Sequence, residues 1–162
     1  ACSDGGRQNP FLTEWDTPYG IPPFADIQVE DYIPAIEAGI EQQNKEIDVI
    51  VNNPESPTFE NTVLPLELSG EILSKVSGVL FNVSETDRTD ELDSVMEKAL
   101  PMLTEHGDNI SFNKGLYERI AKLYHADQSY LNREFPVSLY VNLYLKFSSN
   151  KVAEEGTVFS SS

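Results

Sequence analysis

Residues 28–53, QVEDYIPAIEAGIEQQNKEIDVIVNN, carry the pattern that decides the fold class. Apolar side chains recur along this stretch at helical spacing, with a polar break at Gln43–Asn44. A proline is tolerated in a helix only within the first turn, so Pro34 places the start of the helix near Asp31. The run Asn52–Pro54 ends it. The apolar positions are Ile33, Ile36, Ile40, Ile47, Ile50 and Val51.

Three more helices are predicted downstream, joined by short connections. Residues 56–83 form one apolar stripe, and Pro65 should kink that helix because it removes a backbone donor. In the same helix, Gly70 and Gly78 could permit close approach of a neighbouring helix, but they are interpreted as tolerated glycines.

Residues 90–112 form the third helix, which Thr89 can cap and Pro101 should interrupt. Residues 114–127 form the fourth, with Leu116 and Ile120 facing inward. Four helices with short connections predict an all-α fold, an antiparallel helical bundle.

The two ends of the chain depart from the helical pattern. Residues 9–24, NPFLTEWDTPYGIPPF, hold the only tryptophan, Trp15, among four prolines that prevent a helix. Residues 1–8 lack an apolar anchor, which predicts a disordered start. Apolar residues occupy every second position of residues 135–147, FPVSLYVNLYLKF, and that spacing is typical of a strand.

The charge composition of the chain argues against some classes of binding partner. Acidic residues outnumber basic residues by 27 to 11 in the 162-residue chain, so the formal net charge is -16. Such a charge repels phosphate backbones and anionic lipid, and no nucleic acid is expected as a partner. Hydrophobic residues make up 40% of the chain, enough for one domain with a core. No apolar stretch approaches the ~20 residues needed to span a bilayer.

Carboxylates are plentiful and therefore weak evidence of a site, whereas histidine and cysteine are few and scattered. The HExxH motif of zinc hydrolases is absent, and so is a glycine-rich phosphate loop. His106 and His125 lie on different predicted helices: His106 is interpreted as a surface or partly buried residue, and His125 as a partner of a helix C-terminus. With Cys2 at the terminus, no catalytic, cofactor-binding or metal-binding residue is predicted.

Cys2 has two interpretations. It follows Ala1 and precedes small polar residues, which resembles the cleavage point of a bacterial lipoprotein signal, where the cysteine carries the lipid anchor. The alternative is an incidental cysteine in a disordered start, and the sequence leaves both open. Lipidation would place the chain at the bacterial cell envelope or in the periplasm, whereas an unmodified Cys2 would indicate the cytoplasm.

Residues 9–40, 52–63 (NNPESPTFENTV) and 69–83 (SGEILSKVSGVLFNV) resemble the N-terminal region of the thimet-oligopeptidase-like zinc metallopeptidases, most of all the bacterial peptidyl-dipeptidases. The likeness runs from about Asn9 to Glu134. It implies an almost wholly helical enzyme, several times longer, in which two lobes enclose a channel for short peptides and the zinc site lies far downstream. It also implies that the aromatic-proline segment packs on helices as an ordered strap, with Trp15 at least partly buried.

The resemblance predicts three segments: a disordered start (1–8), a helical N-terminal peptidase domain (9–134) and a divergent tail (135–162). The chain then is a channel-wall fragment of a zinc peptidyl-dipeptidase, truncated before HExxH, inactive alone and without zinc of its own. The alternative is a non-catalytic helical binding module of the cell envelope, anchored through Cys2.

Self-association is a further expectation. Several apolar side chains lie off the main stripes of their helices, and these exposed faces, or residues 135–147, could pair with a second copy. The side chains are Leu64, Leu68, Leu100 and Met102. The alternative is a monomer, in which residues 135–147 fold back over the apolar face or local repacking hides it.

Overall fold

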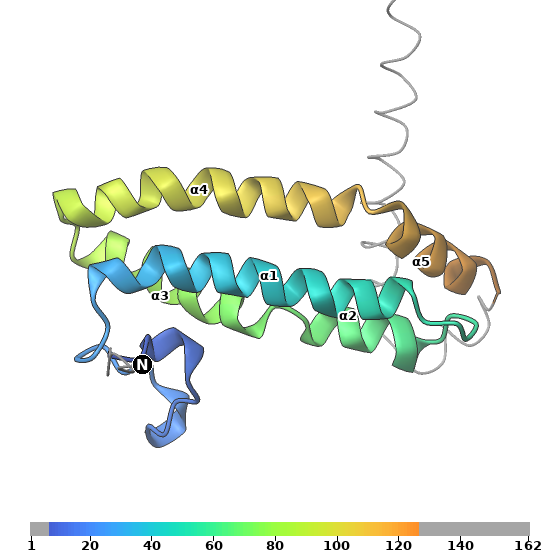
Figure 1. The fold of residues 1–162 in the computed structure, drawn as a ribbon, viewed down its shortest axis with the longest axis horizontal. Helices are drawn as coiled ribbons and strands as arrows, with labels where there is room; N and C mark the ends of the chain where they lie inside the picture. Colours follow the sequence, from blue (N-terminus) through green and yellow to red (C-terminus); the bar gives the residue numbers. More distant parts are fainter. Residues whose placement is uncertain (1–6, 127–162) are drawn as a thin grey trace, which may run out of the picture. The chain divides into compact units, whose positions relative to one another are not determined.

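The computed structural model describes residues 7–126, and this part of the chain is all-α, with helices and short helical turns but no strand (Figure 1). The predicted strand at 135–147 and the divergent tail lie outside the described residues. The chain divides into two compact units. The first unit comprises Ala1–Asn44 with Gly70–Thr104, and the second comprises Lys45–Ser69 with Glu105–Ser162.

Three of the four predicted helices begin and end close to the expected residues. The predicted 28–53 helix is α1 (Tyr32–Val51), preceded by a 3-10 turn at Val29–Asp31. Residues 90–112 form α4 (Asp90–Ser111), and residues 114–127 form α5 (Lys114–Ala126). Thr89 caps α4 as predicted, because its Oγ1 accepts a hydrogen bond of 3.2 Å from the backbone N–H of Leu92.

The prediction of one continuous helix over 56–83 is wrong. A π turn at Phe59–Val63 leads into the short helix α2 (Leu64–Leu68), and α3 (Glu71–Thr86) begins only after a break. The break falls at Ser69–Gly70 and not at the proline. Pro65 lies in the first turn of α2, where a helix needs no donor from it.

Gly70 is required where it stands, so its interpretation as a tolerated glycine is also wrong. Its φ of 74° lies in the left-handed region, which favours glycine. A Cβ added there would also meet the side-chain amide of Gln43 at 2.6 Å. The same interpretation holds for Gly78, where an added Cβ would meet nothing within 4 Å.

Helix α4 continues through Pro101, which was expected to interrupt it. Proline removes one backbone hydrogen bond and frees the carbonyl of Glu97, four residues earlier. Pro101 and Leu100 are both exposed, so water can solvate that carbonyl and the helix persists.

The core of the first unit is built from α1, α3 and α4 together with the aromatic-proline segment. Gly39 of α1 faces the backbone of Leu73 in α3, while Gln43, one turn later, faces Gly70, which precedes α3. The two helices therefore run antiparallel. The fully buried members of this core include Phe11, Ala35, Ile36, Val76, Leu80 and Ala99.

The second unit has a smaller core formed by α1, α2, α4 and α5. Ile50, Leu116 and Ile120 are buried in it, so the predicted inward face of α5 is confirmed. Gly115 lets α5 approach α1, because an added Cβ would collide with the side chain of Val51. Within residues 7–126, no helix combines the length and apolarity that crossing a membrane requires.

The four side chains predicted to lie off the core divide into two groups. Leu64, Leu68 and Leu100 are exposed, by 41%, 70% and 45%. Met102 packs against the core of the first unit, so the prediction is wrong for that residue.

Candidate functional site

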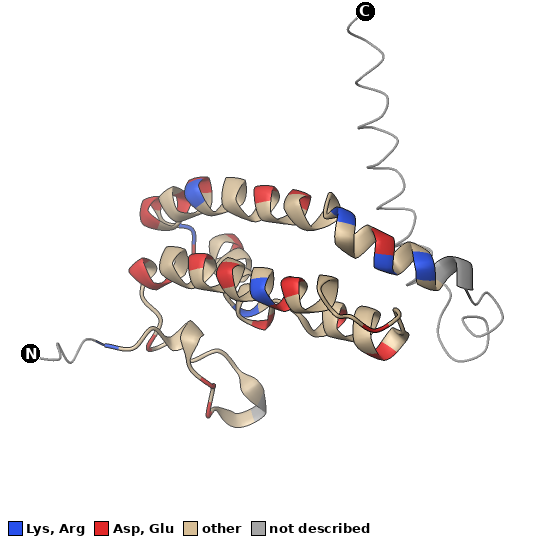
Figure 2. Cartoon of the chain, turned by 45° about the vertical axis from the view of Figure 1, so that its right-hand side comes forward, with Lys and Arg blue, Asp and Glu red and all other residues tan. Residues whose placement is uncertain are grey.

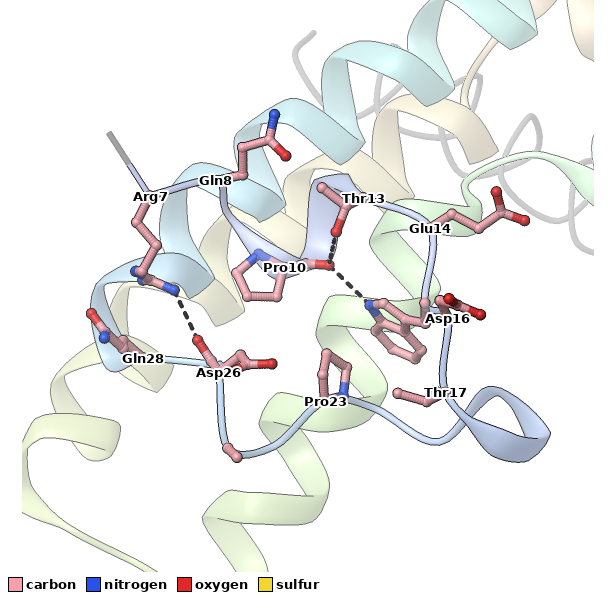
Figure 3. Close-up of a pocket in the computed structure, with 12 residues that line it drawn as sticks. Arg7, Gln8, Pro10, Thr13, Glu14, Asp16, Thr17, Pro23, Asp26 and Gln28 are labelled. Atoms are coloured by element: carbon pink, nitrogen blue, oxygen red, sulfur yellow. Dashed lines mark hydrogen bonds between the residues drawn. The ribbon is translucent and has the colours of Figure 1, made fainter. Parts of the chain in front are cut away.

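The aromatic-proline segment encloses a hollow of about 500 Å³ in the first unit. Arg7 and Asp26 lie at one end of the hollow and Thr17 at the other (Figure 3). At the end near Arg7, its Nη1 donates a hydrogen bond of 2.8 Å to the backbone carbonyl of Asp26. This contact links residues on opposite sides of the hollow.

Trp15 lies half-buried against the core of the first unit. The indole Nε1 donates a hydrogen bond of 2.9 Å to the carbonyl of Pro10, drawn as a dashed line in Figure 3. The ring of Phe11 lies 6.4 Å from the indole, and the Nζ of Lys75 lies 5.3 Å from the indole centroid. These contacts give Trp15 a stabilising role in a segment that prolines keep from being a helix.

Asp31 anchors the segment to the start of α1. Its carboxylate is buried and accepts hydrogen bonds from the backbone N–H of Gln28 at 2.7 Å and from Nη2 of Arg7 at 2.6 Å. The carbonyl of Asp31 accepts another from Nδ2 of Asn9 at 2.8 Å. The hydrogen bond to Asp31 raises the pKa of Arg7, so the cation persists at any physiological pH.

The residues lining the hollow do not form a catalytic arrangement. The hydroxyl of Thr13 donates to the carbonyl of Pro10 at 3.1 Å, and the hydroxyl of Thr17 donates to the carbonyl of Ile21. Each hydroxyl proton is thus held by a backbone oxygen, and among residues 7–126 no histidine lines the hollow to accept it. The hollow therefore offers an ordered surface rather than a nucleophile with its base.

The second unit contains a buried arginine junction centred on Arg119, which is 7% exposed. Its Nε donates to Oγ1 of Thr62 at 3.2 Å, and its Nη2 donates to Oδ1 of Asn61 at 3.0 Å. Its Nη1 donates to the carbonyls of Asn53 and Glu55, at 2.9 and 3.2 Å. These four partners are neutral oxygens. The planar guanidinium group of Arg119 therefore fixes the 53–62 segment against α5.

Sequence inspection alone did not single out Arg119, although a signal existed. An arginine on an amphipathic helix is ordinarily a solvated residue. Arg119 follows Leu116 by three residues and precedes Ile120, so it lies within the apolar stripe of α5. A cation on a buried stripe needs hydrogen-bond acceptors, and the neighbouring loop supplies them.

The PTFENT turn at 57–62 is organised around Asn61. The backbone N–H of Thr58 donates to Oδ1 of Asn61 at 2.8 Å, and the backbone N–H of Asn61 donates to Oγ1 of Thr58 at 3.2 Å. This reciprocal pair is a capping box for the π turn. Nδ2 of Asn61 also donates to the carbonyl of Ser56 at 2.9 Å. The same Oδ1 that caps the turn therefore also accepts from Arg119.

Beside this junction lies an apolar groove of about 370 Å³ between the end of α1 and α2, the α1–α2 groove. Val49 and Leu68 flank it and are 72% and 70% exposed. Both Asn53 and Asn61, which accept hydrogen bonds from Arg119, also line it. The full lining is Glu46, Val49, Ile50, Asn53, Asn61, Pro65, Leu68 and Ser69.

The scattered histidines and cysteine are not brought together in the described part. His106 is buried in α4, with only 4% exposed, rather than lying at the surface, and burial lowers its pKa. Cys2 and the side chain of His125 lie outside what the structure describes. Over residues 7–126 no three His, Cys, Asp or Glu side chains form a group that could hold a metal ion.

The comparisons with known proteins point to one class of enzyme. No protein-family model matches the sequence. The chain is 36% identical over 121 residues to a dipeptidyl carboxypeptidase of Escherichia coli, which covers 75% of this chain and 18% of that protein. It is 38% identical over 112 residues to a dipeptidyl carboxypeptidase of Salmonella typhimurium, covering 69% and 16%.

A third match is oligopeptidase A of Escherichia coli, 26% identical over 119 residues, covering 74% of this chain and 17% of that protein. The chain is a homologue of these thimet-oligopeptidase-family peptidases. The similarity is to the N-terminal region of the relatives. The chain thus spans less than a fifth of the length of the curated relatives it matches.

Proposed function

We propose that this chain is an N-terminal, channel-wall fragment of a zinc metallopeptidase of peptidyl-dipeptidase type, without the catalytic region. In that role it would shape the path of short peptides and would not hydrolyse them alone. The observation that carries the proposal is the 36% identity over 121 residues to a dipeptidyl carboxypeptidase. The all-α character of residues 7–126 agrees with it.

The proposal is supported by the structural roles of the residues that resemble the peptidase family. In the PTFENT turn, Thr58 and Asn61 cap the π turn, while Asn61 and Thr62 accept hydrogen bonds from Arg119. In the opening segment, Trp15 packs on the core. We therefore propose that residues 9–24 are a strap that orders the channel wall. The proposed division of the chain is a short start (1–8), the helical domain (9–134), which includes the strap, and a tail (135–162).

In this proposal, the zinc ligands belong to the part of a family-length enzyme that lies outside this chain. The described residues do not fit a metal: His106 is buried on α4, and no group of three ligands forms among residues 7–126. A catalytic zinc site needs three protein ligands and an activated water.

A domain exchange tests the proposed function. The segment of the Escherichia coli dipeptidyl carboxypeptidase that matches this chain is replaced by the corresponding residues of this chain, and release of dipeptides from short peptides is measured. We expect the exchanged enzyme to keep kcat/KM within about tenfold of the parent, because a wall that folds alike leaves the catalytic geometry in place.

The control for the exchange carries Arg119→Ala, which should loosen the wall and lower activity. A correctly folded exchanged enzyme that binds zinc but hydrolyses nothing would contradict the proposal. Chelator-sensitive hydrolysis by the purified chain alone would contradict the proposal that the fragment is inactive.

A non-catalytic module of the cell envelope, anchored through Cys2, is the second candidate. The Ala1–Cys2 pair followed by small polar residues favours it. Metabolic labelling with a fatty acid in a bacterial host, compared with a Cys2→Ser variant, tests the anchor. Label on the parent chain, with none on the Cys2→Ser variant, would support an anchor at Cys2 and a location in the cell envelope. An unlabelled parent chain would indicate the cytoplasm.

A further inference from the structure

The α1–α2 groove is flanked by apolar side chains that are unusually exposed to water. Val49 on α1 and Leu68 on α2 are exposed by 72% and 70%, and Leu64, one turn earlier on α2, by 41%. Val49 and Leu68 line a groove of about 370 Å³ together with Ile50 and Pro65. Grouped apolar side chains around a hollow mark a binding surface more often than scattered ones do.

Charge indicates what kind of segment the groove would accept. Residues 45–69 contain five acidic side chains and one lysine, so they carry a net charge of -4. Acidic positions also outnumber basic ones along the described helices (Figure 2). The acidic side chains of 45–69 are Glu46, Asp48, Glu55, Glu60 and Glu67.

One segment of the same chain has the complementary composition. Residues 135–147 place apolar side chains at every second position. Residues 135–151 contain Lys146 and Lys151 and no acidic residue, so their net charge is +2. The segment can therefore offer apolar side chains to the groove and cations to its acidic surroundings.

The segment can also reach the groove. Arg119 of α5 is hydrogen-bonded to Asn53 and Asn61, which line the groove, so α5 is fixed at one end of it. From Arg119 the helix continues for seven residues to Ala126, a rise of about 10 Å. The eight residues 127–134 then span up to about 28 Å when extended.

We propose that residues 135–147 dock in the α1–α2 groove and cover Val49 and Leu68. Lys146 and Lys151 then face the acidic side chains of residues 45–69. The net charge of -16 disfavours a second copy as the occupant, because two such chains repel one another. The docking is independent of any peptidase role of the chain.

Thiol reactivity in the full-length chain tests the docking. Cys2 is the only cysteine, so a Cys2→Ser background carrying Val49→Cys reports on one site. We expect this thiol to react with a disulfide reagent at least tenfold more slowly than in the same protein carrying Leu139→Asp and Leu143→Asp. A Phe24→Cys control, at a site 51% exposed in the first unit, should react at one rate in both backgrounds.

A second measurement identifies the occupant. Val49→Cys is combined with Leu143→Cys in the Cys2→Ser background, and oxidation is followed on a non-reducing gel. A disulfide within one chain supports the proposal. A disulfide that forms only between two chains would assign the groove to a second copy and overturn it. Equal thiol reactivity with and without the aspartates, and no disulfide, would also overturn it.

Discussion

Arg119 and Asn61 meet through a hydrogen bond of 3.0 Å although 58 residues separate them in the chain. The acceptor, Oδ1 of Asn61, is the same atom that caps the π turn by accepting from the backbone N–H of Thr58. A single amide oxygen therefore joins the local geometry of a turn to the packing of a distant helix. The turn and α5 should lose stability together when either partner is removed.

Arg119→Ala should lower the free energy of unfolding by about 3 kcal/mol, because it leaves buried oxygens without their donor. Arg119→Lys should recover little of this loss, since an ammonium cannot reproduce the planar fork. Urea denaturation followed by circular dichroism measures both. Lys122→Ala, an exposed position on the same helix, is the control and should change stability by less than about 0.5 kcal/mol. Equal midpoints for the Arg119→Ala and Lys122→Ala variants would refute the structural role of the junction.

Gly39→Ala and Gly78→Ala should change stability in opposite directions. A Cβ at Gly39 would lie 3.0 Å from the backbone nitrogen of Leu73, and α3 would have to move away, at a cost of about 1–3 kcal/mol. A Cβ at Gly78 meets nothing within 4 Å, so alanine should stabilise α3 by up to about 1 kcal/mol. Thermal unfolding of the two variants compares them directly. A stabilising Gly39→Ala would show that α1 and α3 are not in close contact there.

Trp15→Ala should cost about 2 kcal/mol, less than the ~3–5 kcal/mol typical of a fully buried tryptophan, because Trp15 is only half-buried. Trp15→Phe keeps an aromatic ring but loses the hydrogen bond to Pro10, and should cost about 1 kcal/mol. The matched control is Phe24→Ala, since Phe24 is 51% exposed in the same segment and should change stability little. If the thermal midpoint of Trp15→Ala matched that of the Phe24 control, the segment would not be packed.

Stability should decrease as the pH falls through the usual histidine pKa of 6.5. Burial lowers the pKa of His106 in the folded state, so near and below pH 6.5 the unfolded chain binds a proton that the folded chain does not. The slope contributed by one histidine is at most about 1.4 kcal/mol per pH unit. Denaturation midpoints between pH 5.5 and 7.5 should therefore depend on pH less steeply in His106→Gln than in the parent chain. An unchanged slope in the variant would exclude His106 as its source.

Helix positions were predictable because the signals for them are local. The hydroxyl of Thr89 caps the helix that begins at the next residue, and Pro54, three residues after Val51, restricts the backbone of Asn53. The break at Ser69–Gly70 depends instead on tertiary contact, since Gly70 lies against Gln43 of another helix. No periodicity within residues 56–83 could report that contact.

The candidate surfaces were predictable only in part for the same reason. Leu64 and Leu68 lie off the stripe of their predicted helix, and that irregularity correctly marked an exposed apolar face. The groove itself needs α1 beside α2, and the arginine junction needs α5 beside the 53–62 segment. Both arrangements depend on how segments distant in sequence pack, which a pattern within one helix does not contain.

The arginine junction also sets an order of events during synthesis. Asn53, Glu55, Asn61 and Thr62 leave the ribosome between 57 and 66 residues before Arg119 does. At the usual ~5–20 residues per second, that interval is about 3–13 s. During this interval the PTFENT turn can form its capping box but lacks its hydrogen bonds to Arg119. The close packing of Gly115 on Val51 is also missing. We therefore expect nascent chains arrested before residue 119 to expose the 53–62 segment to proteases, and chains that include α5 to protect it.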